Sequence, residues 1–249
     1  APLMTSISLE IIVRTVFGSD DRTTAREMIQ ASTQLVASAH PLLFFSQRTH
    51  VPFFGISPWD RWRKAKARLS VLFDQAIDAR RAVPQTGEDI LSLLCSAHYE
   101  DGQPISREHI HAELMTFLFA GHETTALSMT WAIYHIHRHR EVLRRLRAEL
   151  DSLPDESPST LAAAPYLKCV IQETLRIHPI VTETLRKLKE PMNLGDYRIP
   201  VGVAVAPATV LAHYNPQTYP DPESFCPERF QERSYSPFEY MPFGGGHRR

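Results

Sequence analysis

The stretch AGHETT, Ala120 to Thr125, lies in the middle of an otherwise apolar run, MTFLFAGHETTALSMTWAIYHI (residues 115–136). The run is too apolar on all sides for a surface helix, so we expect a long central helix over about 106–138. Ser106 is of a residue type that caps helix N-termini and marks its start. Glycine and β-branched threonines are poor helix formers, so their place at the centre of this helix calls for a reason.

Gly121, followed by a hydroxyl that can bond back to a carbonyl, favours a local widening of the helix with room for a small ligand. Glu123 and Thr124 place a carboxylate and a hydroxyl at that point, a pair suited to passing protons inward. An ordinary polar spot on a helix is the alternative. A zinc-protease HExxH motif is excluded, because Ala126 stands where the second histidine is required.

The second stretch is ETLR, Glu173 to Arg176, in a helix predicted over 165–177. Residues three apart share a helix face, so the carboxylate and the guanidinium can pair. Apolar neighbours indicate partial burial, where removing one partner leaves a costly unpaired charge. Arg229, in the later stretch PERF, is placed to complete an ion-pair network with them. Such E-x-x-R pairs also occur by chance on many surface helices.

The third stretch is FGGGHRR, Phe243 to Arg249. Three consecutive glycines lose much backbone entropy on folding, which makes sense where the backbone turns tightly or another group approaches closely. The two arginines that follow, Arg248 and Arg249, could bind an anion. We therefore interpret this stretch as the rim of a binding site.

Apolar spacing and turn residues predict the remaining elements. After Pro179 the pattern changes to short strands within 197–210 and a proline-rich meander over 215–230. The predicted class is therefore mainly α with a small β part. The other expected helices lie at 1–18, 21–47 with a break near Pro41, 57–83, within 87–102, and 139–152.

Composition excludes some functions. The formal net charge is −1, which gives no reason to expect a nucleic-acid partner. The three cysteines are far apart without a CxxC motif, which favours a reducing compartment. The run HIHRHR (135–140) would permit a metal site, but metal binding is the disfavoured interpretation. The basic stretch 138–147 would permit docking of an acidic redox partner, but a solvated helix face is favoured there.

In this order, AGHETT, ETLR, PDPESFCPERF and PFGGGHRR resemble the cytochrome P450 family of haem-thiolate monooxygenases, over nearly all of the chain. The resemblance implies an incomplete cytochrome P450 fold. Residues 1–249 would form one partial domain, with the meander and the start of the haem-binding loop at about 214–249.

The resemblance also implies roles for individual residues. Glu123 and Thr124 would be catalytic, and Glu173, Arg176 and Arg229 would form the structural network. The cofactor would be haem b, and its axial cysteine is expected immediately after Arg249, so no metal ligand lies within the chain. The cofactor-binding residues implied are Ala120, Gly121, Arg186, Phe243, Gly246 and Arg248.

The implied function is insertion of one oxygen atom from O2 into a small lipophilic substrate, with electrons from NAD(P)H through a ferredoxin or flavoprotein. Phe117, Phe119 and Ala120 would face the substrate. The motifs are similar to those of soluble bacterial members, which predicts a cytoplasmic protein, although a membrane anchor upstream of Ala1 stays open. The alternative is a truncated or decayed, catalytically inactive helical interaction module.

Overall fold

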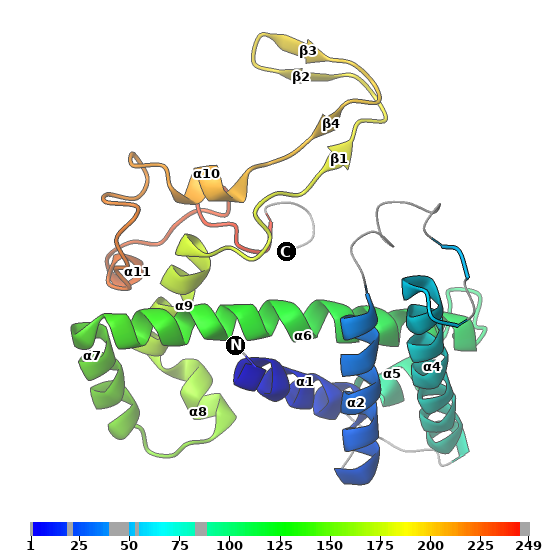
Figure 1. Ribbon diagram of the computed structural model, residues 1–249. Helices are drawn as coiled ribbons and strands as arrows, with labels where there is room; N and C mark the ends of the chain where they lie inside the picture. Colours follow the sequence, from blue (N-terminus) through cyan, green and yellow to red (C-terminus); the bar gives the residue numbers. More distant parts are fainter. Residues whose placement is uncertain (1, 19–21, 40–49, 53–54, 83–88, 245–249) are drawn as a thin grey trace. The chain divides into compact units, whose positions relative to one another are not determined.

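The computed structural model describes residues 2–18, 22–39, 50–52, 55–82 and 89–244. The chain forms two compact units, residues 1–126 and 127–249, and helix α6 (Arg107–Arg138) contributes to both. Figure 1 labels the elements. The other elements of the first unit are α1 (Pro2–Phe17), α2 (Arg22–Ser38), α4 (Pro58–Ala82) and α5 (Ile90–Ser96). Those of the second unit are α7 (Arg140–Asp151), α8 (Pro158–Ala163), α9 (Pro165–Ile177), β1 (Arg186–Lys187), β2 (Met192–Leu194), β3 (Tyr197–Ile199), β4 (Ala204–Val205), α10 (Thr209–His213) and α11 (Arg229–Glu232).

The first unit is built around an apolar core shared by the five helices that the structure describes there. Helix α6 begins as expected, because the Ser106 hydroxyl accepts a hydrogen bond from the backbone N–H of His109 (3.2 Å). The core residues recur at helical spacing on one face of each helix. Representative fully buried members are Val13, Val16, Leu35, Leu69, Phe73, Ile77, Ile110 and Leu114.

Three helix ends meet at Asp89 in the first unit. Asp89 caps α5 by accepting from the backbone N–H of Ser92, and it pairs with Arg80 of α4 at 3.1 Å. Arg80 also donates to the carbonyl of Phe17 at the end of α1 (2.7 Å). Gly18 follows there with φ +56°, and a Cβ on it would lie 2.6 Å from a carboxylate oxygen of Asp89. A glycine is therefore required at this junction.

The second unit packs α7 against α9. Glu149 of α7 caps the N-terminus of α9 by accepting from the backbone N–H groups of Tyr166 (2.7 Å) and Leu167 (2.8 Å). The strands form two antiparallel two-stranded sheets, β1 with β4 and β2 with β3. In the second of these, Met192 is opposite Ile199.

The predicted fold class is confirmed, since the structure is mainly helical with small sheets. Most expected helices appear within a residue or two of their predicted ends, and α9 has the predicted bounds. The second helix ends at Ser38, and the predicted break near Pro41 lies outside the described residues. Three short helices were not predicted, namely α8, α10 and α11. The signal for α8 was Ser157 as N-cap followed by a proline at the first helical position.

Candidate functional site

The AGHETT stretch lies within α6, and the Thr124 hydroxyl bonds back to a backbone carbonyl as expected. Thr124 Oγ1 donates to the carbonyl of Ala120 at 2.5 Å. The predicted widening is wrong, however, because residues 107–138 are α-helical throughout. A threonine hydroxyl bonds to the carbonyl four residues earlier without displacing the backbone N–H that already bonds there, so the helix need not open.

Gly121 is explained by helix α1, which the sequence did not indicate. A Cβ on Gly121 would lie 2.7 Å from Cδ1 of Ile12, closer than side-chain atoms normally approach. Beside it, the buried hydroxyl of Ser8 donates to the carbonyl of His122 at 2.8 Å. The apolar spacing of α1 predicted a buried face but not which residue of α6 it would meet.

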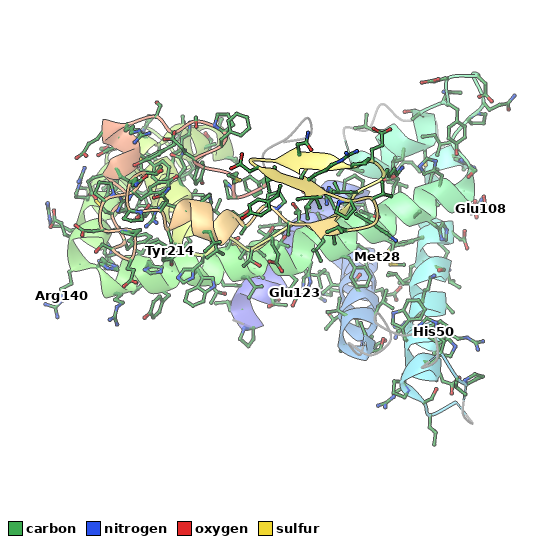
Figure 2. The ribbon with its side chains drawn as sticks, turned by 90° about the horizontal axis from the view of Figure 1, so that it is seen from above. Met28, His50, Glu108, Glu123, Arg140 and Tyr214 are labelled. Atoms are coloured by element: carbon green, nitrogen blue, oxygen red, sulfur yellow. The ribbon has the colours of Figure 1, made fainter. Side chains whose placement is uncertain are left out.

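Glu123 and its neighbour differ in exposure. Glu123 is exposed on α6 (Figure 2), whereas His122 is buried at 5% exposure. Burial lowers the pKa of His122, and its Nε2 has no hydrogen-bond partner among the described residues. The imidazole is therefore neutral at pH 7, while the adjacent carboxylate is open to solvent.

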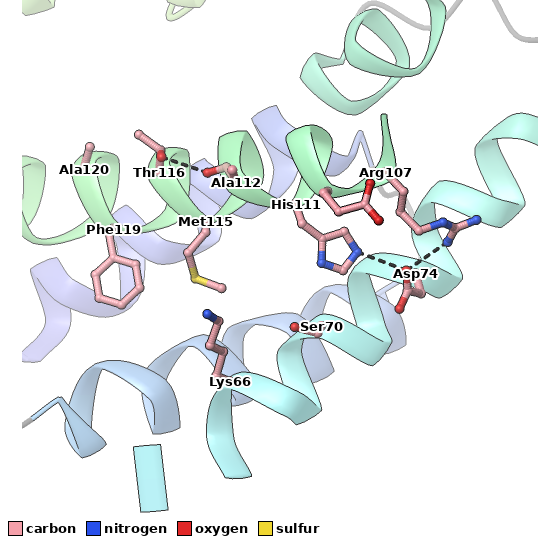
Figure 3. A pocket seen from close by; sticks show the side chains of 11 residues that line it. Lys66, Ser70, Asp74, Arg107, His111, Ala112, Met115, Thr116, Phe119 and Ala120 are labelled. Carbon is pink, nitrogen blue, oxygen red and sulfur yellow. Dashed lines mark hydrogen bonds and ion pairs between the residues drawn. The ribbon is translucent and has the colours of Figure 1, made fainter. Parts of the chain in front are cut away.

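A cavity of about 930 Å³ lies between α4 and the first half of α6 (Figure 3). Its end nearest Ala120 is lined by Met115, Phe119 and Ala120 of α6 and by the Lys66 side chain of α4 (Figure 3). Phe117 packs against the core cluster instead. Of the three side chains predicted to face the substrate, Phe119 and Ala120 therefore border the cavity and Phe117 does not.

The opposite end of this cavity is ionic. Asp74 of α4 accepts from Arg107 Nη1 at 2.9 Å and contacts His111 Nε2 at 3.0 Å (Figure 3). Hydrogen bonding from the Arg107 guanidinium, partly opposed by desolvation, lowers the pKa of the Asp74 carboxyl. One end of the cavity is therefore an ion-pair cluster, and the other combines apolar side chains of α6 with the ammonium of Lys66.

The structure brings together Glu173, Arg176 and Arg229. Arg176 binds both carboxylate oxygens of Glu173, through Nε at 2.7 Å and Nη2 at 2.9 Å. Arg229 Nε donates to Oε1 of Glu173 at 3.1 Å. Glu173 and Arg176 are fully buried, and Arg229 is 7% exposed. This is a closed ion-pair cluster with a bidentate fork at its centre.

Backbone groups complete the hydrogen bonding of this cluster. The N–H of Cys226 donates to Glu173 Oε1 at 2.9 Å. Arg176 Nη1 donates to the carbonyl of His213 (2.8 Å), and Arg229 Nη1 donates to that of Pro220 (3.1 Å). The buried charges are thus both paired and hydrogen-bonded, the condition under which burial of charge is tolerated. The network also ties α9 to α10 and to the meander.

The predicted loop residues are described in part. Phe243 is 76% exposed and is followed by Gly244 with φ +88°, a left-handed conformation that favours glycine. Gly246 and Arg248 lie outside the described residues. Arg186 is exposed on β1 and donates to the carbonyl of Leu185 at 3.0 Å.

The comparison with known families decides what these features belong to. The family model described as Cytochrome P450 matches residues 1–249. The chain belongs to the cytochrome P450 family. The resemblance inferred from the motifs is therefore confirmed.

Curated relatives of the chain include cytochromes P450 of mycobacteria. Cytochrome P450 135B1 of Mycobacterium tuberculosis is 35% identical over 259 residues, covering 100% of this chain and 52% of that protein. Cytochrome P450 137 of the same species is 31% identical over 251 residues, covering 98% of this chain and 50% of that protein. The chain therefore spans about half the length of the curated relatives it matches.

Solved cytochrome P450 structures superimpose on the chain. The retinoic acid bound cyanobacterial CYP120A1 matches with a TM-score of 0.82 at 27% identity. The haem domain of cytochrome P450DA matches with a TM-score of 0.75 at 25% identity. Each comparison covers 98% of this chain and 55% of the solved chain.

The haem that the cytochrome P450 family implies can be tested against these residues. A haem presents anionic propionates, and the guanidinium of Arg186 has no carboxylate partner within the described ranges, so it fits that edge. The iron requires a thiolate, and the only cysteines of the chain, Cys95, Cys169 and Cys226, are thiols whose pKa is raised by desolvation. Among the described residues, Arg186 therefore fits the propionate edge.

In the part of the chain that the structure describes, no group of three or more His, Cys, Asp or Glu side chains is arranged to hold a metal ion. None of the helices in this part has the length and apolar character needed to span a membrane.

Proposed function

We propose that the protein carrying this chain is a haem b-dependent monooxygenase acting on a lipophilic organic substrate. One atom of O2 enters the substrate and the other leaves as water, which takes up two protons and two electrons. The electrons would come from NAD(P)H through a ferredoxin or flavoprotein, in the cytoplasm. The observation that carries the proposal lies in α6, where Phe119 and Ala120 line a cavity and Glu123 and Thr124 follow within the next turn of the helix.

We assign the cofactor contacts from the family resemblance. Arg186 and Arg248 would pair with propionates, and the backbone at Phe243 and Gly246 would form the loop beside the iron. Ala120 would present its small side chain to the haem, with Gly121 beside it in α6 packed against Ile12 of α1. The iron ligand would be a cysteine following Arg249, within one cytochrome P450 domain that includes residues 1–249. When bound, a haem with a thiolate ligand supplies the electron density that favours cleavage of the O–O bond.

The residues of α6 have separate tasks in this proposal. The Thr124 hydroxyl donates a hydrogen bond to the Ala120 carbonyl, and a hydroxyl oxygen can also accept hydrogen bonds. Glu123 is exposed and can exchange protons with solvent. Together they would deliver protons from solvent to the buried side of the helix.

The substrate class follows from the cavity lining. Met115, Phe119 and Ala120 offer apolar contact, so a lipophilic molecule would gain by leaving water there. The solved relative CYP120A1 is bound to retinoic acid, which is a lipophilic molecule and supports the same class.

The proposal is tested by following labelled oxygen and peroxide in the haem-loaded protein. Wild type should transfer one labelled atom from O2 to substrate with little peroxide, and Thr124→Ala should release peroxide instead of product. Thr116→Ala is the matched control, because Thr116 makes the same bond to the carbonyl four residues earlier, at 2.8 Å to Ala112. Tight coupling in Thr124→Ala would refute the proton-delivery role. Absence of haem uptake would favour the inactive interaction module.

A further inference from the structure

His213 is a buried histidine at the end of α10 that none of the motifs contains. It is 0% exposed. Its Nε2 accepts a hydrogen bond from the backbone N–H of Met241 at 2.9 Å, and its Nδ1 lies 3.1 Å from the carbonyl of Arg176. Because a backbone N–H can only donate, Nε2 must be unprotonated. The proton is therefore on Nδ1, which donates to Arg176.

The surroundings hold the imidazole in this orientation. Tyr240 stacks on it with ring centroids 5.5 Å apart and an interplanar angle of 16°, and Tyr219 approaches edge-on at 6.4 Å. In return, the Arg176 guanidinium donates to the carbonyl of His213 at 2.8 Å. Residues 176 and 213 are thus joined by two hydrogen bonds of opposite direction.

The charge state is fixed by the same surroundings. Burial, with a further contribution from the nearby Arg176 guanidinium, lowers the pKa of His213 to about 4. The other groups facing the ring are the neutral phenols of Tyr219 and Tyr240. His213 therefore remains a neutral donor and acceptor at physiological pH.

The hydrogen bond between His213 and Met241 lies at the start of the turn that carries Phe243. The N–H of Gly244 donates to the carbonyl of Met241 at 3.0 Å, closing the turn that carries Phe243. Just before this turn, the Tyr240 hydroxyl donates to the carbonyl of Gln172 on α9 at 3.2 Å. His213 supplies the anchor closest to the turn, through its contact with the backbone of Met241.

We propose that His213 is a positioning residue that fixes the backbone at Met241 to the buried ion-pair helix α9, and so sets where the turn of Phe243 begins. The anchoring follows from this chain's own contacts. Its purpose, to present the haem-binding loop, rests on the proposed function.

Amide exchange tests the anchor directly. In His213→Asn, the side-chain amide can still donate to the Arg176 carbonyl, but no atom reaches the N–H of Met241. We expect exchange at the Met241 amide to accelerate at least tenfold. The amides of Glu239 and Tyr240, which bond to the carbonyl of Ser236, should keep their protection.

The matched control is His135→Phe. His135 is also buried, in the same unit, with its pKa lowered by burial to about 4, but it contacts Phe225 and His178 instead of this segment. The control should leave Met241 exchange unchanged. Equal acceleration in both variants, or loss of protection across residues 236–244 together in His213→Asn, would show a general structural role and overturn the proposal.

A second measurement needs no variant to fold. Nitrogen NMR of labelled histidine in the wild-type protein should show His213 as the neutral tautomer with its proton on Nδ1. The Nε2–H tautomer, or a charged ring at pH 7, would overturn the proposal.

Haem retention distinguishes the anchoring of Met241 from its proposed purpose, the presentation of the haem-binding loop. If the protein binds haem, folded His213→Asn should retain a smaller fraction of it than folded His135→Phe. Equal retention in these variants would overturn the presentation of the haem loop. If wild type binds no haem while Met241 exchange still depends on His213, the anchor stands and the proposed function fails.

Discussion

The second unit contains the same motif twice, in opposite surroundings. EVLR, Glu141 to Arg144, and ETLR, Glu173 to Arg176, both place a carboxylate three residues before an arginine, with leucine between. The first pair is exposed, with side-chain exposures of 66% and 69%, and the second is fully buried. In the buried pair the carboxylate also serves Arg229 and the backbone of Cys226. The i, i+3 spacing alone therefore gives an ion pair. Burial and additional hydrogen-bond partners are what make the second pair connect separate segments of the unit.

The largest expected effect compares these two glutamates. Glu173→Ala leaves two buried guanidiniums without their carboxylate, and we expect it to lower the free energy of unfolding by roughly 3–5 kcal/mol. Glu141→Ala removes the equivalent carboxylate from the exposed pair and should cause no measurable change. Urea denaturation of the two variants measures both. Similar losses in the two variants would break the comparison.

Acid sensitivity separates buried from exposed histidines. Burial holds the folded-state pKa of His213 and of His135 at about 4, below the unfolded value near 6.5. Their neutral forms are therefore fully stabilising above pH 6.5, and stability is lost as the pH falls from 6.5 through 4, by up to about 3 kcal/mol for each residue. Unfolding free energies measured between pH 7 and pH 4 should show this fall.

The pH dependence has its own control. In His213→Asn the slope of stability against pH should be shallower than in wild type, because one proton-binding group of the unfolded state is gone. An unchanged slope would mean that the ring is not held neutral in the folded protein.

A smaller effect is expected at Gly121 in the first unit, where packing replaces charge. Gly121→Ala should destabilise by about 1–2 kcal/mol, since the new methyl meets Cδ1 of Ile12. Ile12→Val removes that atom. In this background Gly121→Ala should become neutral or stabilising, because alanine is the better helix former. The double-mutant cycle is measured by denaturation, and additive effects would remove α1 as the reason for the glycine.

The smallest effect compares two buried serines. Ser8 donates to the carbonyl of His122, whereas the hydroxyl of Ser32 has no hydrogen-bond partner within the described part of the chain. Ser8→Ala should lower the free energy of unfolding by about 1 kcal/mol. Ser32→Ala should be neutral or stabilising, because it removes an unsatisfied polar group. Thermal or urea denaturation of the pair would detect a reversal of this order.

These contrasts show which features the sequence could predict. The apolar period and end signals were sufficient for α6 and α9, since local patterns determine where a helix begins and ends. The association of Arg229 with Glu173 was predictable from charge and motif order. The family assignment followed from the same motifs and was confirmed by the match over residues 1–249.

Other features depend on contacts between distant segments. Nothing in AGHETT indicates that Ile12 packs closely against Gly121. Nor does it indicate that Thr124 bonds to the Ala120 carbonyl within a regular α-helix. His213 belongs to no predicted motif. Its hydrogen-bond partner is a backbone N–H, a group that nearly every residue has, so the sequence does not indicate which residue it contacts. In HIHRHR, His135 and His139 stack as their spacing suggests, but the closest partner of His135 is His178, at 2.9 Å between Nε2 atoms.

The most direct test of the central claim is a ferrous–CO difference spectrum of the haem-loaded protein. The proposed function predicts the absorption band typical of a thiolate-bound haem. The same band should persist when Cys95, Cys169 and Cys226 are all replaced by serine, provided that the variant folds. Loss of the band in one of the three single variants would show that a cysteine of this chain is the iron ligand and contradict the assignment. Absence of the band in wild type would contradict the function itself.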